Sequence, residues 1–188
     1  MKDMFISEIW SILKTSHGSA ILLKPKEKEV AVPIFIGALE MQSILIAKEG
    51  LSLSRPHTHD LFINMLSNVN LTVKKVEVYA LIDDVFHARL IITGGEYTKE
   101  NPLVMDSRPS DAFAIAARKK CPIYLSASVI EQTGVPISFF VSDLEDVPED
   151  RHSSLREQLK QAVAEEEYEQ AAEIRDLLKM LEDEDEAE

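Results

Sequence analysis

Two stretches of this chain place an Arg-Pro dipeptide among hydroxyl and acidic residues, directly before an apolar run. They are Arg55-Pro56-His57-Thr58-His59-Asp60 and Asp106-Ser107-Arg108-Pro109-Ser110-Asp111. Proline suits the first turn of a helix, serine can cap its free N–H groups, and an acid there complements the helix dipole. The second stretch has more polar residues than capping needs, and the first repeats its order of residue types. We therefore predict that the two stretches form a functional site.

The chemistry that these residue types suit is the binding and hydrolysis of a phosphodiester. A helix N-terminus attracts anions, and the planar fork of an arginine fits phosphate oxygens. Carboxylates at the same place would repel a phosphate unless a cation lay between them, and Mg²⁺ or Mn²⁺ prefers such oxygen ligands. A histidine beside them could act as general acid or base.

These considerations assign the candidate residues to three roles. Arg55, Arg108 and Ser110 are predicted to bind substrate. The predicted catalytic residues are His59, Asp60 and Asp111, with His59 moving a proton. A Mg²⁺ or Mn²⁺ ion is the predicted cofactor, with Glu40, Asp106 and Asp111 as its ligands.

A purely structural role is the alternative for both stretches. Arg–Asp pairs at helix starts often only tie caps together, and Pro56 and Pro109 are ordinary first-turn residues. The two interpretations differ in one geometric consequence. If the two stretches lie on opposite sides of the fold, residues 106–111 are a helix cap and no more.

The remaining pattern predicts an α+β domain, with a mixed, largely antiparallel sheet packed with about three helices. Apolar and polar residues alternate in the expected strands, and helical spacing follows each Arg-Pro stretch. A helical turn is expected to end at Gly134. The expected strands are 5–13, 19–24, 30–36, 71–82, 85–93, a short one leading into 104–106, and 121–125; the expected helices are 38–48, one following 55–60, and one starting at 109.

Charge is distributed unevenly along the chain. Residues 1–142 hold 15 acids and 15 Lys and Arg, whereas residues 143–188 hold 18 acids and 5 Lys and Arg, so the net charge of −13 lies in the last part. Neither part has the basic composition of a strong nucleic-acid binder, so we expect only weak or local contact with nucleic acid. The single cysteine excludes an internal disulfide. No membrane segment or signal peptide is evident, and we expect a cytoplasmic protein without membrane contact.

Four motifs together resemble the bifunctional nuclease family: Ile36-Gly37-Ala38-Leu39-Glu40, Arg55 to Leu61, Gly94-Gly95-Glu96 and Asp106 to Ala112. The resemblance covers roughly residues 1–140. It implies an α+β domain, often dimeric, with activity on both RNA and DNA. His57 stands where the family pattern has a small apolar residue, whereas His59 and Asp60 match that pattern.

The C-terminal part resembles a different motif. Leu155-Arg156-Glu157-Gln158-Leu159-Lys160 and Glu167 to Asp176 are similar to the UVR motif of excision-repair proteins, which implies a helical hairpin that contacts another protein. The expected organisation is a nuclease-like domain at 1–142, an acidic linker at 143–152, a helical hairpin at 153–182, and an acidic disordered tail at 183–188.

The sequence thus predicts a nuclease that acts on RNA, DNA or both with the help of a divalent metal. It also predicts a homodimer, and a protein partner for the C-terminal hairpin. The alternative is a non-catalytic module that binds an anion or acts as an adaptor through the hairpin.

Overall fold

The computed structural model describes residues 3–15, 18–51, 54–140 and 174–175. The chain separates into two units, Met1–Phe139 and Phe140–Glu188. Of the second unit, only Phe140, Ile174 and Arg175 are described, and the last two are helical. The expected linker, hairpin and tail lie outside the described residues.

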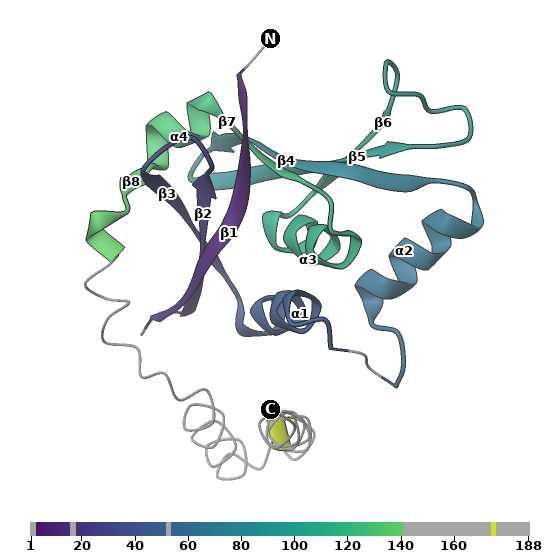
Figure 1. The fold of residues 1–188 in the computed structure, drawn as a ribbon, viewed down its shortest axis with the longest axis horizontal. Helices are drawn as coiled ribbons and strands as arrows, with labels where there is room; N and C mark the ends of the chain where they lie inside the picture. Colours follow the sequence, from purple (N-terminus) through teal and green to yellow (C-terminus); the bar gives the residue numbers. More distant parts are fainter. Residues whose placement is uncertain (1–2, 16–17, 52–53, 141–173, 176–188) are drawn as a thin grey trace. The chain divides into compact units, whose positions relative to one another are not determined.

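The first unit is a mixed α+β fold, as expected, with an eight-stranded sheet (Figure 1). Its strand order is β6-β5-β4-β7-β1-β2-β3-β8, and among these neighbours only β4 and β7 run parallel. The strands are β1 (Met4–Thr15), β2 (Gly18–Pro25), β3 (Val30–Ile36), β4 (Thr72–Ile82), β5 (Val85–Thr93), β6 (Leu103–Ser107), β7 (Ile123–Ser126) and β8 (Val135–Pro136). The expected meander of the first three strands is confirmed by their antiparallel registers.

The described residues of this unit include the helices α1 (Ala38–Lys48), α2 (Thr58–Asn68), α3 (Pro109–Lys119) and α4 (Ala127–Thr133). The first three lie on one side of the sheet, and α1 and α3 lie side by side (Figure 1). The apolar run of α3 is buried, with Phe113 fully covered between the sheet and the neighbouring helices. Burial of this run fixes the rotation of α3, so the charged side chains at its start, Arg108 and Asp111, remain accessible to solvent.

Local backbone geometry explains several boundaries. Asp83 and Asp84 both have positive φ, which is the geometry of a two-residue hairpin turn between β4 and β5. Gly94 has a φ of +124°, and a Cβ atom there would collide with the carbonyl oxygen of Asn70. Only glycine therefore fits where the end of β5 passes close to the backbone that precedes β4. Pro33 lies on β3 beyond the two residues that pair with β8, so β8 does not cover this part of the strand.

A buried acid lies in the middle of β4. The Glu77 side chain is 5% exposed and contacts Lys75 Nζ at 2.8 Å and Arg89 Nε at 2.7 Å. Burial raises the pKa of Glu77, but the hydrogen bonds and charges of Lys75 and Arg89 outweigh it, and the pKa lies below its ordinary value. The register pairs Glu77 with Arg89 on β5, and Arg89 with Asp106 on β6.

Replacing Glu77 with glutamine is expected to lower the free energy of unfolding at pH 7 by about 1 kcal/mol, because Lys75 and Arg89 lose a charged acceptor. A carboxyl with a depressed folded pKa stabilises the fold above its unfolded pKa, and that contribution disappears as pH falls through the folded value. The difference between Glu77→Gln and wild type should therefore narrow below pH 4.5.

Urea unfolding at pH 7 and at roughly pH 3 measures this difference. Glu131→Gln, which removes an exposed acid of α4, is the matched control and should show no such change. If the difference in free energy of unfolding between wild type and Glu77→Gln widened on acidification, the assigned direction of the Glu77 pKa would be contradicted.

Candidate active site

The two Arg-Pro stretches meet in space at the starts of α2 and α3. His59, in the first turn of α2, lies with Nε2 3.3 Å from Oδ1 of Asp111, in the first turn of α3. The two residues are 52 positions apart in the chain. The two stretches therefore do not lie on opposite sides of the fold, the arrangement in which residues 106–111 would be only a helix cap.

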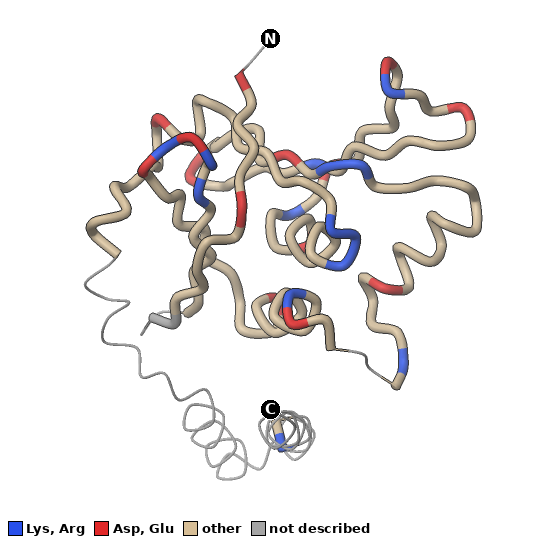
Figure 2. Tube along the Cα trace, in the orientation of Figure 1, with Lys and Arg blue, Asp and Glu red and all other residues tan. Residues whose placement is uncertain are grey.

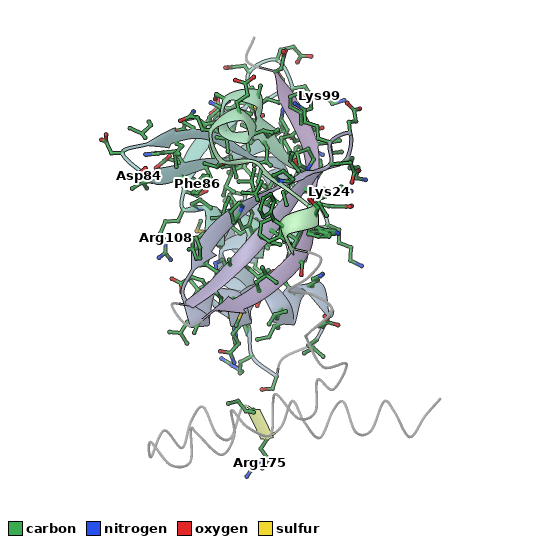
Figure 3. All side chains as sticks on the ribbon, turned by 90° about the vertical axis from the view of Figure 1, so that its left-hand side faces the viewer. Lys24, Asp84, Phe86, Lys99, Arg108 and Arg175 are labelled. Atoms are coloured by element: carbon green, nitrogen blue, oxygen red, sulfur yellow. The ribbon has the colours of Figure 1, made fainter. Side chains whose placement is uncertain are left out.

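Arg108 extends this contact to a third helix. Its Nε donates to Asp111 Oδ2 at 2.9 Å, and its NH1 donates to Glu40 Oε1 in the first turn of α1 at 3.1 Å. Its side chain is 66% exposed and projects outward at the edge of the molecule (Figure 3). Arg108 thus links α1 and α3 while part of its guanidinium remains open to solvent.

His59 is held from both sides of its ring. Besides Asp111 at Nε2, it has the hydroxyl oxygen of Ser43 on α1 at 3.0 Å from Nδ1. The ring is 18% exposed, so the contacts are partly shielded from water. Ser43, His59 and Asp111 therefore form a continuous hydroxyl–imidazole–carboxylate chain.

The carboxyl group of Asp111 is kept ionised in this arrangement. Its partial burial raises its pKa, but hydrogen bonds and charge from Arg108 and His59 outweigh that effect, and the pKa lies below its ordinary value. The same pairing with Asp111 raises the pKa of Arg108. Asp111 is therefore an anionic hydrogen-bond acceptor at neutral pH.

A second ion pair lies behind the first and fixes the helices. Arg118 is 8% exposed; its Nε donates to Asp60 Oδ1 at 2.9 Å, and its NH1 donates to the carbonyl oxygens of Ser43 and Ala114. The other oxygen of Asp60 accepts from the backbone N–H of His57. Both oxygens of Asp60 thus have a hydrogen-bond partner at the start of α2. The remaining terminal nitrogen of Arg118 is buried without a partner in the described part of the chain.

Three predicted residues lie apart from this cluster. Arg55 is exposed before α2, and nothing in the described part of the chain pairs with it. Ser110 is buried in the first turn of α3. Asp106 is exposed on β6, where the strand register places it opposite Arg89 of β5. Side chains alternate between the two faces of a strand, so Asp106 and Ser107 point to opposite faces.

The predicted metal ligands are consequently only partly assembled. Glu40 and Asp111 share Arg108 as a partner, whereas Asp106 does not join them. Within the described residues, no group of three or more His, Cys, Asp or Glu is arranged to hold an ion. Two carboxylates still suit Mg²⁺ or Mn²⁺, since such ions keep several waters and take other ligands from a substrate phosphate. Negative charge also exceeds positive charge around Arg108, because its one guanidinium lies between the two carboxylates of Glu40 and Asp111.

The residues that sequence reasoning missed are Ser43 and Arg118. Arg118 follows Asp111 by seven positions, a spacing that puts both on one helix face, and this signal was present in the sequence. Ser43 follows Glu40 by three positions on α1 in the same way. Its contact with His59 depends on the packing of α1 against α2 and α3, which no local pattern reveals.

Comparisons with known proteins show the family to which the chain belongs. The family model of the bifunctional nuclease domain matches residues 21–138, which is more than half of the chain. The chain belongs to the bifunctional nuclease domain family. A model of the UvrB/uvrC motif matches residues 149–184, as the sequence predicted.

Relatives come from bacteria and plants. The chain is 32% identical over 117 residues to an uncharacterized protein of Mycobacterium tuberculosis, covering 62% of this chain and 67% of that protein. It is 30% identical over 188 residues to bifunctional nuclease 1 of Arabidopsis thaliana, covering 89% of this chain and 54% of the relative. Bifunctional nuclease 2 of rice (Oryza sativa subsp. japonica) is 30% identical over 129 residues, with 66% and 38% covered. The chain thus spans about half or less of these plant relatives.

Two further properties of the described residues are their charge distribution and whether any helix could span a membrane. Acids and bases are interspersed along the trace of the described residues (Figure 2). In that part of the chain, no helix is both long and apolar enough to span a membrane.

Proposed function

We propose that this protein is a nuclease that hydrolyses phosphodiester bonds of RNA, DNA or both. The observation that carries the proposal is the contact between His59 and Asp111, which joins a proton-transfer group to the exposed guanidinium of Arg108. The names of the plant relatives, together with the family match, support this class of reaction.

Each member of the cluster has a chemical role in the proposed reaction. Arg108 uses three of its five N–H groups on Asp111 and Glu40, which leaves donors for phosphate oxygens. Asp111 orients the His59 ring and stabilises its protonated form. His59 transfers the proton, and Arg118 with Asp60 keeps α2 and α3 in register.

A divalent cation belongs to the proposal because of the charge balance. Phosphate entering beside Glu40 and Asp111 meets two carboxylates and one guanidinium, so a Mg²⁺ or Mn²⁺ ion would remove the repulsion. Glu40 and Asp111 are the residues that would hold it. When bound, the ion would supply charge stabilisation for the phosphate oxygens.

The test is cleavage of fluorescently labelled single-stranded RNA and DNA by the full chain, with Mg²⁺ or Mn²⁺ and with a chelator. His59→Ala is expected to lower the rate by about 10²-fold or more, the usual contribution of a positioned proton-transfer group. His57→Ala, which changes an exposed histidine two positions away, is the matched control and should cleave like wild type. Equal rates for His59→Ala and wild type would refute the site, and cleavage unaffected by chelation would refute the cation.

The second candidate function is a non-catalytic anion-binding or adaptor module. The observation that favours it is the pairing of Arg108 with two carboxylates, which reduces its availability to substrate. Under this alternative, the purified protein binds an oligonucleotide without cutting it under any of the conditions above. The hairpin's protein partner remains a prediction.

The predicted homodimer also remains a prediction, and one surface of α2 supports it. Leu61 and Met65, one helical turn apart, are 63% and 54% exposed. Val69, the next residue in this spacing, is 57% exposed. The exposed residues between them on α2 carry no charge, so two copies of this stripe could face each other without repulsion.

A further inference from the structure

Among the described residues, Ser43 supplies the hydroxyl within hydrogen-bond distance of the His59 ring. Asp111 Oδ1 lies 3.3 Å from Nε2 of His59, and the Ser43 hydroxyl oxygen lies 3.0 Å from Nδ1. In the tautomer that donates Nε2–H to Asp111, the Nδ1 lone pair faces the Ser43 hydroxyl. A base that is held by a third group and bonded to a hydroxyl is the arrangement that activates a nucleophile.

We propose that Ser43 is the nucleophile of the reaction and forms a covalent phosphoserine intermediate. This inference rests on the proposed nuclease function and specifies its chemistry. Notably, neither the sequence motifs nor the family match assigns a role to Ser43.

The reaction proceeds in two displacements. In the first, Ser43 Oγ forms a bond to phosphorus as the bond to the leaving sugar oxygen on the opposite side breaks; the Ser43 proton passes to Nδ1 of His59, and solvent water protonates the leaving oxygen. In the second, water attacks the phosphorus of the phosphoserine and releases its proton to solvent, while His59 returns the stored proton to Ser43 Oγ as the bond between that oxygen and phosphorus breaks. The products are a terminal phosphate, a free hydroxyl and the unmodified enzyme.

Two guanidinium groups belong to the network of contacts around Ser43. Arg108 contacts Asp111 and Glu40, and Glu40 is one helical turn before Ser43 on α1. Arg118 donates to the carbonyl oxygen of Ser43 itself, and its other terminal nitrogen is buried without a partner in the described residues. An orphaned buried N–H on a charged group is costly, and we expect a phosphoryl oxygen on Ser43 to accept a hydrogen bond from it.

The decisive measurement is stereochemical. A chiral phosphorothioate substrate cleaved in ¹⁸O water should retain configuration at phosphorus, because two in-line displacements each invert it. Inversion would show that water attacks directly. That outcome overturns the role of Ser43 but leaves the nuclease function intact.

Variants and a chemical probe separate the two proposals further. Ser43→Ala should lower cleavage by at least about 10²-fold, whereas Ser67→Ala, a surface serine of α2, should not change it. Circular dichroism checks that each variant is folded.

A chemical probe tests the reactivity of Ser43 directly. Diisopropyl fluorophosphate should modify the wild-type protein at Ser43, as detected by peptide mass spectrometry, and should modify the His59→Ala variant much more slowly. Failure of folded wild type to react at Ser43 would overturn the inference, whether or not the protein cleaves nucleic acid. Absence of cleavage together with modification of Ser43 would refute only the nuclease function.

Discussion

Replacing Arg108 with alanine is expected to lower the rate of nucleic-acid cleavage by about 10²- to 10³-fold, the usual cost of removing one group that stabilises charge in a transition state. Arg108 is the most exposed member of the cluster and retains donors that its two carboxylate partners do not use. Its removal would leave only the proposed cation to offset the charge of Glu40 and Asp111 beside the phosphate. The loss should therefore appear mainly in kcat, with a smaller rise in KM.

Folding should be nearly unaffected by this change, since exposed ion pairs contribute little to stability. Arg108→Lys keeps the charge but not the planar fork, and we expect it to recover only part of the rate. Lys99→Ala, on the exposed β5–β6 loop (Figure 3), removes one positive charge elsewhere and is the control. Wild-type kinetics in Arg108→Ala would show that the phosphate binds at another place.

Replacing Arg118 with alanine is expected to lower the free energy of unfolding by about 2 kcal/mol. Breaking a fully buried ion pair costs about 3–5 kcal/mol, and the figure is reduced because the Asp60 side chain is one-third exposed. The change also removes the donor for the carbonyl oxygens of Ser43 and Ala114 and opens a gap between α1 and α3. Thermal unfolding should show a decrease in Tm of roughly 5 °C.

Three further variants isolate the cause of that loss. Arg118→Met keeps much of the packing volume but no donor, so its deficit measures the polar contacts. Lys119→Ala, the next residue on α3, should change stability by less than about 0.5 kcal/mol. The single variants Arg118→Ala and Asp60→Asn should be non-additive when combined, because each breaks the same contact. Additive losses would show that the pair does not couple α2 to α3.

Local sequence patterns were sufficient to predict most of the helices and strands. The helix at 38–48 and the strands at 30–36 and 85–93 have the predicted bounds, because side-chain periodicity, turn residues and glycine act over a few positions. Periodicity and turn residues also gave the mixed sheet and the helix that starts at Pro109. The prediction of about three helices covers α1 to α3, and the turn expected before Gly134 is α4.

Tertiary structure decided which of the candidate residues act together. Arg108 and Asp106 are two positions apart, yet one joins the cluster and the other lies beside Arg89, because the chain leaves β6 between them. Ser43 and Arg118 entered the site only through the packing of α1 against α3, set by burial of Phe113 and its neighbours. The sequence by itself determined the residue types, the helix starts that display them and the repeated order of residue types in the two Arg-Pro stretches. The contact of His59 with both Ser43 and Asp111 was decided by the three-helix layer, since side chains from three separate elements converge only when a shared core fixes all three.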